Sequence, residues 1–377
     1  MTGRGTKGIL VATVLIFLGN VPCPATAQLG GGSGSGDGGG TGTYALEEGE
    51  RNLKFAAIPI PGYSEVLGFS LGVIGMAYYK MDRHDDDLPP SSTGILGFYS
   101  QNNSWVGMAF QKFHLDQDKW RATAAFGTGS FKYQFNPSSA GPGFPDVFLD
   151  YTTVSDFLFL KGSRKTWRQL YLGLEVLAWS AKVSIEPDLA DVPNEFYSSV
   201  GANGEWDGRN HIMYPTSGTN TTVRYDVYDD AFGSDRNFRK LKVRISGYTT
   251  LGDTTHVLAG RFLTDSAFGD VPFSGQAILS GNQNLRGYAN GRHRGNQLLT
   301  LETEYRWNFW GRWGAVGFAG VGFVGEDWSS FSTGDALPAS GLGLRFRMIE
   351  TYKINARVDY GWGKNDQAVY FSIGEAY

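Results

Sequence analysis

Hydrophobic and polar residues alternate with a period of two over much of this chain. From Leu299 to Phe309 the odd positions are mostly hydrophobic or aromatic, and the even positions carry Thr300, Glu302, Glu304, Arg306 and Asn308. Residues 354–362 alternate in the same way, with Asn355, Arg357 and Asp359 on the polar face. Successive side chains of a strand point to opposite faces, so the pattern predicts β-strands that separate two environments.

Fifteen such segments follow one another without a convincing amphipathic helix between them. They are residues 65–80, 93–101, 104–114, 119–133, 150–162, 167–185, 197–207, 219–229, 238–251, 255–266, 297–310, 314–325, 339–349, 353–363 and 368–377. A single-chain bacterial barrel has an even number of strands, because both of its ends finish on the same side of the membrane. We therefore predict about sixteen strands, with one missed or two merged between Gly141 and Ile185.

Alternation alone also fits a soluble β-sandwich with a solvated outer face. In a membrane barrel, an Arg or Lys on the lipid side near the midplane costs about 2–4 kcal/mol. The charged faces of the strands are therefore expected to point into the lumen. The predicted lumen side chains are Lys242, Arg244, Glu302, Glu304, Arg306, Arg357 and Asp359.

Composition favours the barrel over the sandwich. The 377 residues include 53 Gly, 25 Phe, 19 Tyr and 10 Trp, and aromatic rings gather at the two interfaces of a membrane barrel. A net charge of -4 shows no basic excess, so nucleic acid is not an expected partner. The predicted fold class is all-β, a transmembrane antiparallel β-barrel of the bacterial outer membrane.

The N-terminus has the three parts of a secretory signal. Arg4 and Lys7 form a basic start, residues 9–18 are apolar, and Ala25-Thr-Ala27 is a small-x-small cleavage site. The apolar run is about half of the roughly twenty residues that span a bilayer. We predict a signal peptide at 1–27, a Gly-rich linker with a short periplasmic segment at 28–54, and the barrel at 55–377. The single cysteine, Cys23, would leave with the signal.

Three motifs occur in order along the predicted barrel. A turn carries Asp-x-Arg-Asn and then Pro-x-x-Gly, with the residues Asp207, Arg209, Asn210, Pro215 and Gly218. A long loop at 270–297 contains Leu285, Arg286, Gly287 and Tyr288. The strand Arg357-Val-Asp-Tyr-Gly361 precedes a final strand whose expected C-terminal signal is Phe371, Ile373 and the aromatic Tyr377. Together these motifs resemble the bacterial surface-antigen barrel superfamily, which includes the BamA and TamA assembly proteins and two-partner-secretion transporters.

The resemblance implies that the long extracellular loop folds back into the lumen. Arg286 would then pair with acidic residues on inward-facing strand positions, and Glu304 and Asp359 are the candidate partners. One position departs from the family pattern, because Gly320 stands where family members often have an acidic residue. A second departure is at the N-terminus, which shows no periplasmic repeat domains and resembles a barrel-only branch of the superfamily.

The sequence shows no catalytic, cofactor or metal site. An outer-membrane phospholipase would need a Ser–His pair with an orienting group, and no histidine has a recognisable serine partner. The histidines are His84, His114, His211, His256 and His293. Asp85-Asp-Asp87 is expected to be a solvated loop, so we predict a protein that is not an enzyme and needs no cofactor.

Three functions remain open on the sequence. The first, implied by the resemblance, is to assist insertion or passage of proteins or lipids at the outer membrane. It would use a weak seam between the first strand and Val369–Tyr377, where a client strand could pair. The second is a passive pore or structural barrel. The third is an adhesive surface antigen that works through residues 81–92. The expected partners are outer-membrane lipid and client outer-membrane or secreted proteins, and the sequence is silent on oligomeric state.

Overall fold

The computed structural model describes residues 53–64, 67–79, 81, 91–135, 149–186, 191–211, 214–279, 281, 283–289, 291–350 and 353–377. The predicted signal peptide, nearly all of the predicted linker and the Asp85–Asp87 cluster lie outside these residues. Within the described residues, no helix is long and apolar enough to cross a membrane.

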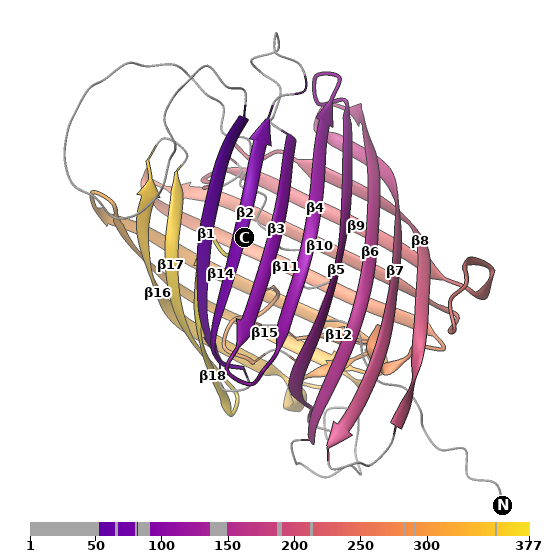
Figure 1. Ribbon diagram of the computed structural model, residues 1–377. Helices are drawn as coiled ribbons and strands as arrows, with labels where there is room; N and C mark the ends of the chain where they lie inside the picture. The colour runs from indigo at the N-terminus through magenta and orange to yellow at the C-terminus, as the bar shows by residue number, and fades with distance from the viewer. Residues whose placement is uncertain are drawn as a thin grey trace, which may run out of the picture.

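Sixteen antiparallel strands close into a barrel, with each strand paired to its neighbours in chain order (Figure 1). The first eight are β1 (Leu53–Ser64), β2 (Gly68–Tyr79), β3 (Ser91–Ser100), β4 (Trp105–Leu115), β5 (Trp120–Phe135), β6 (Leu149–Trp167), β7 (Leu170–Glu186) and β8 (Asp191–Asp207). The others are β9 (Gly218–Tyr228), β10 (Phe238–Leu251), β11 (Asp253–Gly269), β14 (Gln297–Trp310), β15 (Trp313–Gly325), β16 (Leu337–Ile349), β17 (Ile354–Gly363) and β18 (Asp366–Ile373). The predicted fold class and strand number are confirmed.

The sixteenth strand is not where the sequence pattern placed it. It is β1, at the very start of the barrel, and it includes two residues assigned to the linker. The region from Gly141 to Ile185 contributes β6 and β7, each a single long strand. The sequence pattern did not predict β1 because this strand contains Pro59 and Pro61, and proline argues against a central strand. Proline is tolerated here because β1 stands where the sheet closes on itself.

The boundary between β1 and β18, called the seam here, is thinly paired. Only Tyr63↔Val369 is in register across it among the described residues. By contrast, β17 and β18 pair without interruption from Ala356↔Ile373 to Gly363↔Asp366. In Figure 1 the indigo β1 stands next to the yellow β17 and β18. The barrel is therefore closed, but its closing contact is its weakest.

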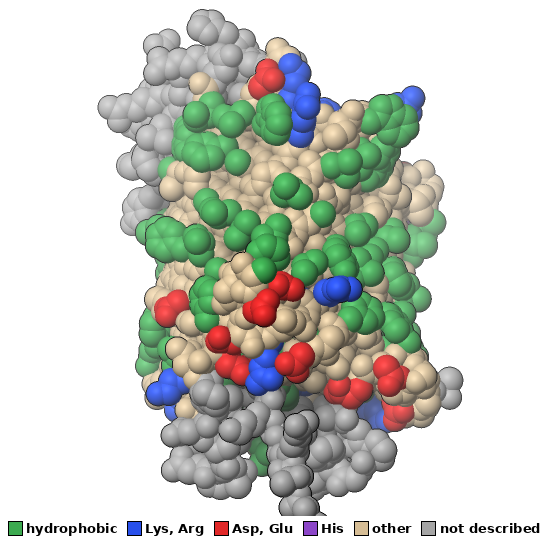
Figure 2. Space-filling model, turned by 90° about the vertical axis from the view of Figure 1, so that its right-hand side faces the viewer, with side chains coloured by type: hydrophobic (Ala, Val, Ile, Leu, Met, Phe, Trp, Pro, Cys, Tyr) green, Lys and Arg blue, Asp and Glu red, His purple; other side chains and the backbone are tan. Residues whose placement is uncertain are grey.

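The outer wall is apolar over most of its height. Its exposed side chains are large and hydrophobic on every long strand, including Leu174, which is 66% exposed, and Leu342, which is 64% exposed. In the view of Figure 2, charged side chains gather in the lower part of the wall and at its upper rim. Tryptophans border this wall at the strand ends, for example Trp120, Trp167 and Trp310. This is the surface that a bilayer requires.

The inner wall has two different halves. From β10 to β17 it carries buried charged side chains, as predicted. From β2 to β8 it is largely apolar, with a packed cluster that includes Phe110, Trp179 and Tyr197. The predicted lumen charges all lie in the first of these halves, and the second also carries the buried carboxylates of Glu175 and Glu195. Phe273, from the segment between β11 and β14, packs against the apolar cluster.

Strand alternation fixes which connections share an end of the barrel. Residues 270–296, called the insertion here, join β11 to β14 at one end, together with residues 326–336. The short turns at 311–312 and the residues after β18 lie at the other end. The ends of β2 and β3, which pair as Tyr79↔Ser91, also lie at this second end. The segment 81–92 of the adhesive alternative therefore joins the barrel opposite to the insertion, and the two cannot both be extracellular.

Candidate functional site

The insertion folds into the lumen on a short sheet of its own. After the 3-10 turn η3 (Phe273–Gly275), β12 (Ala277–Ile278) pairs with β13 (Arg294–Gly295). The residues between these strands extend toward the inner faces of β14 to β18. Leu285 and Tyr288 are fully buried there, with 0% of their surface exposed. The predicted inward fold of this loop is what the structure shows.

Arg286 is the centre of this contact. Its Nη1 donates to Asp359 Oδ2 at 3.0 Å, and its Nη2 donates to Glu304 Oε2 at 2.6 Å. Both carboxylates were expected from the sequence as partners, and both are completely buried. The Arg286 guanidinium also lies 3.7 Å from the centre of the Phe318 ring. A buried arginine needs several acceptors, and this one has them.

A third carboxylate, Glu302 of β14, holds Arg286 more fully than either predicted partner. Glu302 accepts from the Arg286 main-chain N at 2.9 Å, from Nε at 3.1 Å and from Nη2 at 2.8 Å. The alternation in β14 placed Glu302 in the lumen, but nothing in the sequence singled it out as a partner. Arg286, Glu302, Glu304 and Asp359 are called the Arg286 cluster below.

Gly320 of β15 stands directly opposite Glu302 in the barrel wall. A Cβ on Gly320 would lie 2.7 Å from Leu285 Cδ1 and 2.6 Å from the main-chain oxygen of Leu301. The position that often holds an acidic residue in the family is therefore filled by Leu285. The arginine contact is nevertheless complete, because Glu302 and Asp359 supply the acceptors.

The other two residues of the motif attach the insertion to β16–β18. Gly287 has φ +110, and a Cβ there would lie 2.7 Å from the Trp362 main-chain oxygen, so only glycine fits. Its N–H donates to Tyr370 Oη at 3.0 Å. Tyr288 Oη donates to the Pro338 main-chain oxygen at 2.7 Å and accepts from Lys364 N at 2.9 Å. Each member of Leu285–Tyr288 thus has a separate structural role.

The turn motif lies at the opposite end of the lumen. Arg209 donates to both carboxylate oxygens of Asp207, at 2.7 and 2.8 Å, and Asn210 Oδ1 accepts from the N–H groups of Thr216 and Ser217. Gly218 has φ +96, with no room for a Cβ beside the Gly208 main-chain oxygen. These contacts fold the turn back on itself.

The folded turn reaches across the lumen to the strands of the Arg286 cluster. The Pro215 main-chain oxygen accepts from Arg306 Nη1 at 3.2 Å, and Tyr214 Oη accepts from Asn308 Nδ2 at 2.7 Å. The turn motif and the insertion therefore meet the same strand, β14, from opposite ends.

The C-terminal strand signal is only partly as predicted. Phe371 and Ile373 lie in β18, in register with Val358 and Ala356. Tyr377 does not lie in the strand, because β18 ends at Ile373. Residues 374–377, called the tail here, turn into the lumen beneath the Arg286 cluster. The prediction of a strand that continues to Tyr377 is wrong, because the buried side chains of Arg261, Arg306 and Arg345 donate hydrogen bonds to the tail in the lumen.

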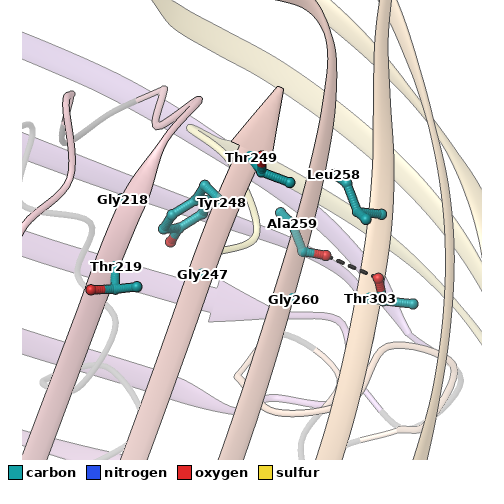
Figure 3. Close-up of a pocket in the computed structure, with 9 residues that line it drawn as sticks. All are labelled: Gly218, Thr219, Gly247, Tyr248, Thr249, Leu258, Ala259, Gly260 and Thr303. Atoms are coloured by element: carbon teal, nitrogen blue, oxygen red, sulfur yellow. Dashed lines mark hydrogen bonds between the residues drawn. The ribbon is translucent and has the colours of Figure 1, made fainter. Parts of the chain in front are cut away.

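The outer wall carries a shallow groove of about 340 Å³ across β9, β10, β11 and β14. Figure 3 shows its floor, where Gly247 and Gly260 are paired and are flanked by Thr219 and Thr303. Thr303 Oγ1 donates to the Ala259 main-chain oxygen at 3.1 Å. The groove arises because two glycines meet on the side that faces lipid. It is separate from the site in the lumen.

Comparisons with known proteins agree with this architecture. Residues 92–377 match the model of the Omp85 superfamily domain. The chain matches none of the curated proteins. BamA from Haemophilus ducreyi lacking POTRA domains 1–3 is 14% identical, with a TM-score of 0.56, over 85% of this chain and 69% of that one.

Two CdiB structures share the fold, with similar sequence identities and TM-scores. CdiB from Acinetobacter baumannii is 15% identical, with a TM-score of 0.59, over 86% of this chain and 60% of that one. CdiB from Escherichia coli is 12% identical, with a TM-score of 0.59, over 87% and 63%. This chain thus spans less than two thirds of either CdiB chain. Because the superfamily match covers most of the chain, the protein is an outer-membrane β-barrel that belongs to the Omp85 superfamily.

Proposed function

We propose that this barrel assists the insertion or translocation of proteins or lipids at the outer membrane. The observation that carries the proposal is the seam, where β1 and β18 share the single pair Tyr63↔Val369. An open strand edge is a template for another strand, and main-chain hydrogen bonds across it would supply the affinity. The family match and the BamA and CdiB folds support the same function.

In this proposal the insertion holds the strands on one side of the seam in place while the seam opens. The Arg286 cluster joins the insertion to β14 and β17, and Gly287 and Tyr288 join it to β16–β18. The strands on one side of the seam are therefore fixed from the lumen, whereas β1 receives no contact from the insertion among the contacts described above. A client strand could then pair at the seam without unfolding the wall.

The role we propose is not enzymatic. Among the described histidines, His114 contacts Asp118 at 2.8 Å, His256 contacts Tyr305 at 2.6 Å on the outer wall, and the His293 ring packs edge-to-face with the Tyr288 ring. These are structural contacts rather than nucleophile–base pairs. We further propose that a signal peptide directs export, and that the partners are outer-membrane lipid and client proteins.

The test uses the chain from Gln28 to Tyr377 reconstituted in liposomes. The folding rate of an unrelated, urea-unfolded outer-membrane barrel is measured with and without it. We expect a marked acceleration that Arg286→Ala abolishes, because the change removes the arginine that joins the insertion to the buried carboxylates of β14 and β17. Breaking a buried ion pair costs about 3–5 kcal/mol.

Arg312→Ala is the matched control for this experiment. It also removes an arginine from an ion pair, with Glu350 at 2.7 Å, but in an exposed turn where such pairs contribute little. Acceleration should persist in this variant. A folded wild-type barrel that gives no acceleration would contradict the proposal and favour a passive pore or structural barrel.

A further inference from the structure

Two lysines and a threonine form one row on the lumen face of β4, β5 and β6. Strand pairing sets Lys112 opposite Thr123, and Thr123 opposite Lys161. Each of the three stands two residues from a member of the apolar lumen cluster on its own strand, so all three side chains also face the lumen. These neighbours are Phe110, Ala125 and Phe159. The row therefore lies at the edge of the apolar half of the inner wall.

The two lysines carry charges that no ion pair neutralises within the part of the chain that the structure describes. The carboxylates that act on Lys161 are those of Glu175 and Glu205, and both are bound by arginines instead. The pairs are Glu175 with Arg224 Nε at 2.5 Å and Glu205 with Arg121 at 4.0 Å. Lys112 and Lys161 are also close enough to repel one another. Charges that are drawn out of bulk water need a partner of opposite sign.

The lumen next to this row is open to water and positively charged. Arg224 and Lys242 lie one row nearer to the end opposite to the insertion, where they pair directly across β9 and β10. Their side chains are 27% and 36% exposed, although both face inward. Like charges directly opposite in a sheet are destabilising, so a second pair of cations adds to the unmet demand for negative charge. A solute that enters from that end can reach Lys112 and Lys161.

We propose that Lys112, Thr123 and Lys161 bind a phosphate-type anion in the lumen. Neighbouring strands lie about 4.8 Å apart, so the two lysines, two strands apart, have their Cα atoms about 10 Å from one another. Their flexible four-carbon stems allow both ammonium groups to reach one anion, and the Thr123 hydroxyl can donate from the wall between them. A lysine binds phosphate as a point charge, and a divalent anion suits two such charges. This binding does not depend on the proposed function.

The test measures the unfolding temperature of the mature barrel in lipid-free detergent micelles while sodium phosphate is added. A ligand that binds only the folded state raises this temperature as its concentration increases. Sodium chloride at equal ionic strength corrects for screening. We expect a larger increase with phosphate than with chloride. Lys112→Gln and Lys161→Gln should each weaken the apparent affinity for phosphate about tenfold, as expected for the loss of one charge-assisted hydrogen bond.

Lys240→Gln is the matched control. Lys240 belongs to the same row of the inner wall, opposite Asp226, but its ammonium group pairs with Asp265 at 3.4 Å. The response to phosphate should therefore be unchanged in this variant. Thr123→Val should weaken the response, whereas Thr123→Ser should retain it because serine keeps the hydroxyl. All of these changes preserve or remove a polar group without enlarging the side chain, so the barrel is expected to fold.

A short-chain phosphatidic acid in the same micelles separates the two sources of such an anion. Stabilisation by inorganic phosphate assigns the site to a free anion, and stabilisation by the lipid alone assigns it to a lipid headgroup. In both cases Lys112→Gln must reduce the effect. The proposal is overturned if neither compound stabilises the wild-type barrel more than chloride does, or if both lysine variants respond like the wild type. No client protein is used, so this outcome is separate from that of the liposome assay.

Discussion

At the scale of single residues, the sequence predicted Arg286 and two of its three carboxylate partners in the Arg286 cluster. Arg286 was identifiable from its motif, and Glu304 and Asp359 from their place on the charged faces of two strands. Glu302 has the same sequence features as Glu304, yet it accepts three hydrogen bonds from Arg286. What distinguishes it is the position of Leu285 over Gly320, a tertiary contact that no pattern along one strand encodes.

Gly320 is accordingly expected to tolerate no side chain. Gly320→Ala brings a Cβ within 2.6 Å of the Leu301 main-chain oxygen and 2.7 Å of Leu285. We expect a loss of about 1–3 kcal/mol in unfolding free energy, as for other overpacked interiors, measured by denaturant unfolding in detergent micelles. Gly317→Ala on the same strand is the control, because its nearest neighbour, Leu342 Cδ2, is 3.9 Å away. Equal stability of the two variants would refute the packing argument.

At the scale of elements, the strands and the insertion differ in how much the sequence says about them. Fifteen of the sixteen strands follow from period-two alternation, since each separates lipid from lumen. β1 was missed because its prolines and uncharged run look like a lead-in. The tail was missed because its aromatic last residue, Tyr377, continues the alternation of β18. Its departure from the sheet depends on Arg261, Arg306 and Arg345, which come from three other strands.

The insertion should loosen in acid through His293. Burial, with Arg292 and Lys364 nearby, lowers the pKa of His293 from 6.5 to about 4. Below pH 6.5 the released insertion binds a proton that the docked insertion does not, so docking weakens as the pH falls from about 6.5 to about 4. The weakening is at most about 1.4 kcal/mol per pH unit.

Hydrogen exchange of residues 283–289, corrected for the intrinsic pH dependence of exchange, measures this effect. His293→Asn removes the titrating group and should make the corrected protection flat over the same range. A wild-type protein with constant protection between pH 6.5 and pH 4.5 would rule out His293 as the cause.

At the scale of the whole molecule, closure of the barrel depends on a strand that is poorly suited to pairing. Pro59 and Pro61 cannot donate hydrogen bonds, and the ladder between β1 and β2 runs through both without a shift in register. The missing donors are therefore best assigned to the edge that faces the seam. The sequence itself limits how tightly the wall can close.

Replacing both prolines should therefore tighten the seam. Pro59→Ala with Pro61→Ala returns two N–H donors to β1. We expect a higher unfolding temperature in micelles. In the liposome assay we expect the barrel to increase the folding rate of the client by a smaller factor. Ala57→Ser, at a neighbouring position of β1 that already has its N–H group, is the control. A double variant with unchanged melting and unchanged acceleration would show that the prolines do not set the strength of the seam.

The unequal strand lengths have a consequence for the bilayer. β6 has 19 residues, whereas β18 has 8. A strand of eight residues is about 27 Å long and, at a tilt of about 40°, spans about 20 Å, against a hydrocarbon core of about 30 Å. Hydrophobic mismatch is therefore concentrated beside β18, where lipid must thin to meet the short wall. A polypeptide that enters the membrane there crosses less hydrocarbon than it would anywhere else around the barrel.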